Sequence, residues 1–200
     1  VYNEVMLPAN APPHFADRSM LWNSVEWAEK KRDAQLAREV EMALPKELPR
    51  AAQIKLVRAF VQQQFVDAGM CADVAIHDKE DGNPHAHILL TVRPLSSDGS
   101  WAQKSRLVYD LDDAGQRIAL PNGRWKCHKE NLVDWDHRQN AEKWRKAAAE
   151  AINEALREYG FSQSFVDHRS YARQNVQQIP TVHEGARIRM MEKRGIHTEL

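Results

Sequence analysis

The sequence contains little cysteine and no long apolar run. Its 200 residues include two cysteines, Cys71 and Cys127, which are too few for a disulfide framework. No charged-then-apolar leader opens the chain, and no apolar stretch approaches the roughly 20 residues that a membrane-spanning helix needs. Internal repeats are absent as well. These absences argue against a disulfide-stapled secreted domain, a helical membrane protein and a repeat array, and we expect a soluble cytoplasmic protein.

The chain has no excess of either charge. It carries 28 Lys and Arg against 28 Asp and Glu, so its formal net charge is zero. Proteins that coat nucleic acid through charge alone are basic overall, and any nucleic-acid binding here must therefore be local. Basic residues gather over 168–173 and 186–194, but a solvated helix face explains each run equally well.

Hydrophobic patterning predicts an α/β fold. Apolar residues recur at helical spacing in three predicted helices, 19–28, 51–68 and 131–159. They alternate with polar residues in three predicted strands, 38–44, 73–77 and 85–93. A turn-rich loop joins the last two strands into a hairpin. We expect an antiparallel sheet with helices packed on its apolar face and a three-histidine metal site on its open face.

The predicted domain organisation has one core. The predicted parts are a single core domain over 1–200, an inserted loop or hairpin over 95–129 and a polar C-terminal extension over 161–200 that ends in a short helix. Inside the insertion, segments 106–111 and 117–120 flank a turn and are predicted to pair. The chain opens at Val1 in a strand-like stretch, so we expect an N-terminally truncated fragment.

Three histidines are the sharpest chemical feature of the sequence. Alternation places His85 and His87 on one face of a predicted strand, while the apolar residues of that strand point to the other face. On the partner strand, Val74 and Ile76 face the core, so His77 faces the same open side. The hairpin is therefore predicted to bring three imidazoles together.

Three imidazoles on one sheet face are typical of a catalytic metal site. They fill part of the shell of a divalent ion and leave positions open for water or a phosphate oxygen. The alternative is that each histidine is a surface residue of a solvent-facing strand. Glu41 is predicted to lie on the same face, where it can orient a ligand histidine or activate a nucleophile. Glu39 shares that face and competes for this role, and a merely exposed strand glutamate is the remaining alternative.

The hairpin sequence HDKEDGNPHAHILLTVRP resembles the three-histidine motif of the MobA/MobL conjugative relaxases, a branch of the HUH endonucleases. Residues 21–48, 165–175 and 179–199 are similar to further segments of that family in the same order, so the resemblance covers essentially the whole chain. It implies a DNA relaxase of plasmid mobilisation that nicks and rejoins one strand. The implied partners are single-stranded DNA at the transfer origin, relaxosome accessory proteins and a coupling protein, with no membrane insertion.

The resemblance also implies a mechanism. A divalent ion held by His77, His85 and His87 polarises the scissile phosphate while a tyrosine attacks it. The 5′-phosphotyrosine link that forms conserves the phosphoester energy for rejoining the strand. Mn²⁺ or Mg²⁺ is the expected ion, although three imidazoles would take up Zn²⁺ or Ni²⁺ during purification.

The nucleophilic tyrosine of this family lies upstream of anything that resembles Val1. The chain has four tyrosines, none of which is assigned the role: Tyr2, Tyr109, Tyr159 and Tyr171. We therefore expect the fragment to bind metal and to be weak or inactive as a nickase.

Two further groups of residues are candidate DNA contacts. The family-like segment after the long helix contains His168, Arg169 and Arg173, and an arginine fork can hold a phosphate bidentately. Pairing of Asp167 with Arg169 is an equal alternative. The inserted loop offers an aromatic side chain for base stacking and basic ones for phosphates: Trp101, Arg106, Arg124 and Lys126. For the tryptophan, packing of the hairpin is the alternative.

Two other functions are compatible with these residues. A three-histidine metal hydrolase of small substrates would use the same ligands, but it leaves the other family-like segments unexplained. A non-catalytic DNA-binding or relaxosome-assembly module would explain the missing tyrosine. It predicts that metal is dispensable for DNA affinity.

Overall fold

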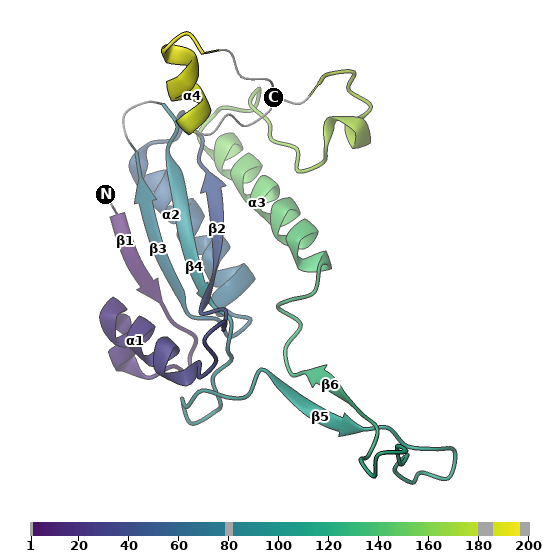
Figure 1. The fold of residues 1–200 in the computed structure, drawn as a ribbon. Coiled ribbons are helices and arrows are strands. Elements are labelled where there is room, and N and C mark those ends of the chain that lie inside the picture. Colours follow the sequence, from purple (N-terminus) through teal and green to yellow (C-terminus); the bar gives the residue numbers. More distant parts are fainter. Residues whose placement is uncertain (1, 79–81, 180–185, 197–200) are drawn as a thin grey trace. The chain divides into compact units, whose positions relative to one another are not determined.

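The computed structural model describes residues 2–78, 82–179 and 186–196. The chain forms two compact units, Val1–Val166 and Asp167–Leu200. The second unit begins inside the segment that the sequence predicts as a polar extension. Figure 1 shows the arrangement of the elements within each unit.

A four-stranded antiparallel sheet is the centre of the first unit. Its strands lie in the order β1-β3-β4-β2. Their bounds are Tyr2–Met6 (β1), Ala37–Ala43 (β2), Ala72–His77 (β3) and His85–Thr91 (β4). The predicted hairpin is confirmed as β3 and β4, with His77 paired to His85. β2 adds to the other edge of β4 and places Glu41 opposite His87.

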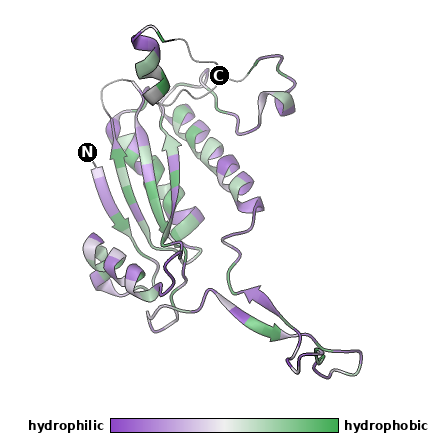
Figure 2. Ribbon diagram, viewed as in Figure 1, coloured by the Kyte–Doolittle hydropathy of each residue, from purple (hydrophilic) through white to green (hydrophobic). Residues whose placement is uncertain are grey.

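Two helices cover one face of this sheet. They are α2 (Arg50–Val61), which continues as the short π-helical segment Gln62–Val66, and α3 (Gln139–Glu158). Apolar residues of α2, α3, β3 and β4 form one buried cluster, and hydrophobic colouring is concentrated along β3 and β4 in Figure 2. Gly69 follows with a positive φ of 97°, a conformation that glycine adopts without strain and that ends the segment as predicted.

The remaining helix of the first unit, α1 (Arg18–Ala28), corrects the prediction that helices pack on one face only. Asp17 caps it by accepting a hydrogen bond from the backbone of Met20. Its Arg18 makes two hydrogen bonds to Asp73, at 2.7 and 2.6 Å, and the indole of Trp22 makes a third at 2.9 Å. Because Asp73 alternates with the core residue Val74, α1 is anchored on the histidine face, at the end of β3 away from His77. Below that end, α1 and the short 3-10 helix Pro13–Ala16 enclose a second small core.

The insertion is a separate two-stranded ribbon of β5 (Ser105–Tyr109) and β6 (Cys127–Asn131). Its exposed position agrees with the prediction, but the predicted pairing of 106–111 with 117–120 is largely wrong. Around the turn at Gly115, the chain forms one bridge between Leu111 and Arg117 with two backbone hydrogen bonds beside it, after which the chain turns again and β6 pairs with β5. The longer antiparallel ladder satisfies more backbone groups than the local one could.

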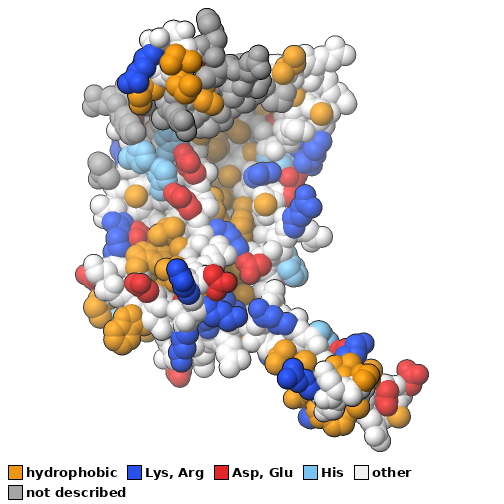
Figure 3. Space-filling view, viewed as in Figure 1, with side chains coloured by type: hydrophobic (Ala, Val, Ile, Leu, Met, Phe, Trp, Pro, Cys, Tyr) orange, Lys and Arg blue, Asp and Glu red, His pale blue; other side chains and the backbone are white. Residues whose placement is uncertain are grey.

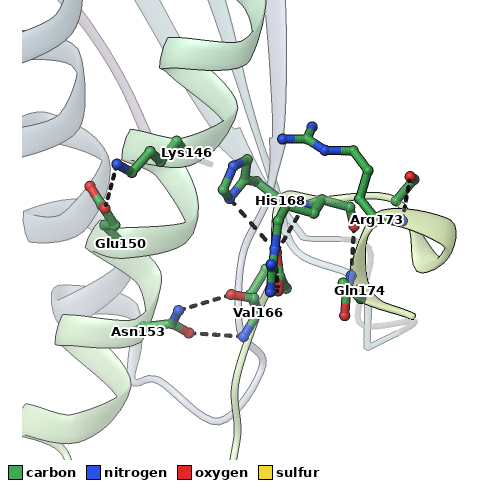
Figure 4. Close-up of polar contacts among 10 residues, drawn as sticks. Lys146, Glu150, Asn153, Val166, His168, Arg173 and Gln174 are labelled. Atoms are coloured by element: carbon green, nitrogen blue, oxygen red, sulfur yellow. Dashed lines mark hydrogen bonds and ion pairs between the residues drawn. The ribbon is translucent and has the colours of Figure 1, made fainter. Parts of the chain in front are cut away.

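The first unit ends at a side-chain clamp. Asn153 of α3 donates to the carbonyl of Val166 and accepts from its amide, each at 2.9 Å (Figure 4). The second unit contains the 3-10 helix Tyr171–Gln174 and helix α4 (Ala186–Lys193), which confirms the predicted short helix near the end.

Candidate metal centre

Three imidazoles lie together on the open face, at the end of the β3–β4 hairpin. The rings of His77 and His87 stack with their centroids 4.7 Å apart and their planes 13° from parallel. The ring of His85 lies 5.8 Å from that of His77 and 6.5 Å from that of His87. Antiparallel register explains the cluster, because His77 pairs with His85 and two residues along β4 return His87 to the same face. The structure therefore brings together the three histidines that the alternation selects.

Two carboxylates of β2 stand beside the histidines. Figure 3 shows pale blue histidine side chains next to red carboxylates on this face. Glu39 Oε1 lies 2.7 Å from His87 Nδ1, which is a hydrogen bond. Glu41 Oε1 lies 3.8 Å from His85 Nε2, which is an ion-pair distance and too long for a hydrogen bond. Both glutamates share the predicted face, but Glu39 makes the close contact.

The three imidazoles are suitable ligands for a divalent ion, but their present arrangement does not form a metal site. Neutral imidazoles are good ligands for first-row metals. The ring nitrogen Nδ1 of His85 is buried and, among the described residues, has no hydrogen-bond partner. When it is unprotonated, such a nitrogen can donate its lone pair to a bound cation. Across residues 2–78, 82–179 and 186–196, however, no group of three or more His, Cys, Asp or Glu side chains is arranged to hold a metal ion as it stands. The metal centre stays a prediction.

Tyr2 cannot serve this face of the sheet. It pairs with Ile76 and packs against the core cluster beneath α2, so its ring lies on the face opposite the histidines. Burial, together with a hydrogen bond to Glu4, raises the pKa of Tyr2 to about 12. Tyr109 belongs to the ribbon, where the guanidinium of Arg117 lies 4.0 Å from its ring centroid. The nucleophile stays unassigned.

Of the DNA contacts predicted in the insertion, the tryptophan packs in a small core and the basic residues lie on the surface of the ribbon. Trp101 packs on Phe15, with ring centroids 5.5 Å apart, and donates to Ser24 Oγ at 2.8 Å. Trp101 therefore has a packing role, but in the small core beside α1 and not in the hairpin, as the packing alternative expected. The basic candidates lie on the ribbon. Arg106 pairs with Glu130 at 2.7 Å, Lys126 pairs with Asp110 at 3.3 Å, and Arg124 is exposed.

The other candidates belong to the second unit. The Arg169 guanidinium binds both carboxylate oxygens of Asp167, and this hydrogen bonding lowers the pKa of Asp167 to about 2. The sequence alternative of an Asp167–Arg169 pair is therefore present. His168 Nδ1 lies 3.8 Å from Asp167, and Gln174 donates to the Arg169 carbonyl at 2.6 Å (Figure 4). The backbone of Arg173 donates to Ser170 Oγ in the same turn. The DNA-binding roles of His168, Arg169 and Arg173 stay predictions.

Sequence reasoning missed a charged network at the opposite end of β4 from the histidines. Glu29, at the end of α1, is bound by Arg93 at 2.9 Å and by Lys104 at 2.7 Å. Burial alone would raise the pKa of Glu29, but the hydrogen bonds from the two cations outweigh it and the pKa is held below its usual value. These three residues are far apart along the chain, and no local pattern joins them.

Comparisons with known proteins identify similar chains. The MobA/MobL family matches residues 1–194. The chain is 34% identical to "Probable mobilization protein MobA" of Bifidobacterium longum, in an alignment that covers 95% of this chain and 36% of that protein. It is 36% identical to "Conjugal transfer protein TraA" of Agrobacterium fabrum, over 100% of this chain and 19% of that protein. The chain thus spans only a minor part of these relatives.

A solved structure is also similar. A chain described under "Molecular Basis of Vancomycin Resistance Transfer in Staphylococcus aureus" superposes with a TM-score of 0.70 at 31% identity, covering 86% of this chain and 76% of that one. Within the described residues, no helix has the length and apolar character to cross a membrane.

Proposed function

Because the chain belongs to the MobA/MobL family, we propose that it supplies the metal-binding core of a relaxase, an enzyme that nicks and rejoins one strand of plasmid DNA during mobilisation. The relatives are named for mobilization and conjugal transfer, which supports this role. The proposed substrate is single-stranded DNA at the transfer origin, in the cytoplasm. The proposed partners are the accessory and coupling proteins of transfer.

One observation carries the proposal: the cluster of His77, His85 and His87 on a sheet face that α2 and α3 leave uncovered. These three residues would hold the ion, with Mn²⁺ or Mg²⁺ as the working metal and Zn²⁺ or Ni²⁺ as contaminants of purification. When bound, the ion supplies charge stabilisation to a phosphate.

The residues of this chain would divide the remaining work. A tyrosine hydroxyl would attack the phosphorus, the P–O3′ bond would break, and the departing 3′ oxygen would take up a proton. Glu41, whose side chain is 58% exposed, would accept the proton of the attacking hydroxyl. Arg106, Arg124 and Lys126 would bind phosphates, with Arg106 and Lys126 exchanging their present carboxylate partners for DNA.

The experiment that tests the proposal is calorimetric titration of Mn²⁺ into metal-stripped protein. The wild type is compared with a double variant, His85→Ala with His87→Ala. We expect one site per chain in the wild type and none in the variant, with unchanged circular dichroism because the substitutions lie on the open face. Lack of binding in the wild type would refute the metal centre and favour the non-catalytic module. Unfolding of the variant would show that the histidines are structural.

A further inference from the structure

We propose that Glu39 is the positioning residue of the site: its carboxylate accepts a hydrogen bond from the Nδ1–H of His87 and thereby leaves Nε2 of that ring as the lone-pair donor. The inference about the imidazole concerns the metal-free protein. Only its consequence for metal affinity rests on the proposed function.

Register alone would select the other glutamate. Glu41 is directly opposite His87 across the β2–β4 ladder, whereas Glu39 is opposite Leu89, one pair further along the same face. Each glutamate side chain nevertheless crosses to β4 diagonally, toward the histidine one pair along the same face. Glu39 reaches His87 Nδ1 at 2.7 Å, and Glu41 points to His85 at 3.8 Å. Diagonal neighbours on one face of an antiparallel sheet are within reach of long side chains, so the crossing involves no distortion of the ladder.

Chemistry makes this contact more than an exposed ion pair. A neutral imidazole carries its proton on one of two nitrogens, and a hydrogen bond to one nitrogen decides which remains a donor to a metal. A carboxylate behind a ligand histidine fixes its tautomer and ring orientation and raises its basicity. Here the stack against His77 restrains the ring of His87 from one side while Glu39 restrains it from the edge.

The chain offers a matched control for the test. Glu39 and Glu41 lie on the same strand and the same face, and each side chain is 58% exposed. Replacement of either by alanine therefore removes an equally exposed charge that lies within 4 Å of one histidine, 2.7 Å from His87 for Glu39 and 3.8 Å from His85 for Glu41. A difference between the two variants reports the hydrogen bond and not the general electrostatics.

The first readout is the tautomer of His87. Long-range ¹H–¹⁵N NMR spectra of the metal-free protein should show the neutral His87 ring protonated on Nδ1 in the wild type and in Glu41→Ala. In Glu39→Ala the spectrum should shift toward the Nε2-protonated form. A His87 tautomer that Glu39→Ala leaves unchanged would overturn the proposal.

The second readout is Mn²⁺ affinity. Glu39→Ala should weaken binding by about 10- to 100-fold, whereas Glu41→Ala should leave it within about threefold. Glu39→Gln keeps an acceptor oxygen and should recover part of the loss. Equal losses in the two alanine variants would overturn the positioning role. If the wild type binds no Mn²⁺, the metal centre fails, but the tautomer measurement still decides the assignment of Glu39.

Discussion

At the scale of single residues, one buried carboxylate fixes α1 to the sheet. Asp73 is nearly inaccessible and accepts three hydrogen bonds, two from the guanidinium of Arg18 and one from the indole of Trp22. A bidentate arginine pair is geometrically specific as well as strong. Asp73 therefore sets the position of α1 on the histidine face.

Removal of this charge should destabilise the protein. We expect Asp73→Asn to lower the free energy of unfolding by about 2–3 kcal/mol, because the arginine loses a charged acceptor in a buried site. The measurement is urea denaturation followed by circular dichroism. Glu130→Gln breaks an arginine pair on the exposed ribbon and should change stability far less. Equal effects of the two substitutions would contradict a structural role for the buried position.

Residue types and facing could be predicted from sequence, but the choice between neighbours could not. The alternation of His85 and His87 with core residues determines their face, and the hairpin adds His77. Glu39 and Glu41 satisfy the same rule equally. Which of them hydrogen-bonds to an imidazole depends on the side-chain rotamers of two neighbouring strands. The alternation of polar and apolar residues does not determine these rotamers.

At the scale of elements, a buried charge cluster joins the end of α1 to the chain that follows β4. The Glu29 side chain is 6% exposed and binds Arg93 and Lys104. Arg93 also donates to the Ala102 carbonyl, and Lys104 donates to the Gln35 carbonyl. One carboxylate thus secures the helix and both sides of the loop that leads to the ribbon.

This cluster predicts a pH dependence of stability. The pKa of Glu29 is lower in the folded protein than its ordinary value of 4.5, so the unfolded chain binds the proton more tightly. The stabilisation is complete above pH 4.5 and is lost as the pH falls through the lowered folded pKa. Thermal melts between about pH 6 and pH 3 should show wild type approaching Glu29→Gln in stability as the pH falls. A constant difference across that range would contradict this linkage.

Helices and strands whose apolar residues recur at a regular spacing could be predicted from sequence. Pairings and positions that depend on residues far away in the chain could not. The alternation in β4 and the apolar stripe of α2 correspond to observed elements. The partner of β5 was predicted wrongly, because a nearby turn suggests a local hairpin whereas β6 lies about twenty residues on. The face occupied by α1 depends on Asp73, which no property of the helix itself reveals.

At the scale of the whole chain, the ribbon is joined to the rest of the first unit through a narrow base. The amide of Leu132 donates to the carbonyl of Lys104 at 3.0 Å, immediately before β5 and after β6. The strands pair with each other and not with the four-stranded sheet. The ribbon is therefore a removable part of the fold.

Replacement of residues 105–131 by a two-glycine linker tests this. We expect the melting temperature and the Mn²⁺ affinity to stay close to wild type, because the sheet and its cores are untouched. Affinity for single-stranded DNA should fall, and its salt dependence should weaken by roughly 0.7 in log–log slope for each phosphate that the ribbon binds in the wild type. Fluorescence anisotropy at several salt concentrations measures both. DNA binding identical to wild type would exclude the ribbon as a DNA-binding element.

The histidine hairpin also has a consequence for the order of folding. All three imidazoles lie within residues 77–87, so one local event gathers them, and hairpins form in about 1–10 µs. Glu39 is 48 residues away from His87 and arrives only when β2 docks against β4. Long-range pairing of this kind is slower, because a large loop must close first. The three imidazoles are therefore gathered before the Glu39 carboxylate reaches His87.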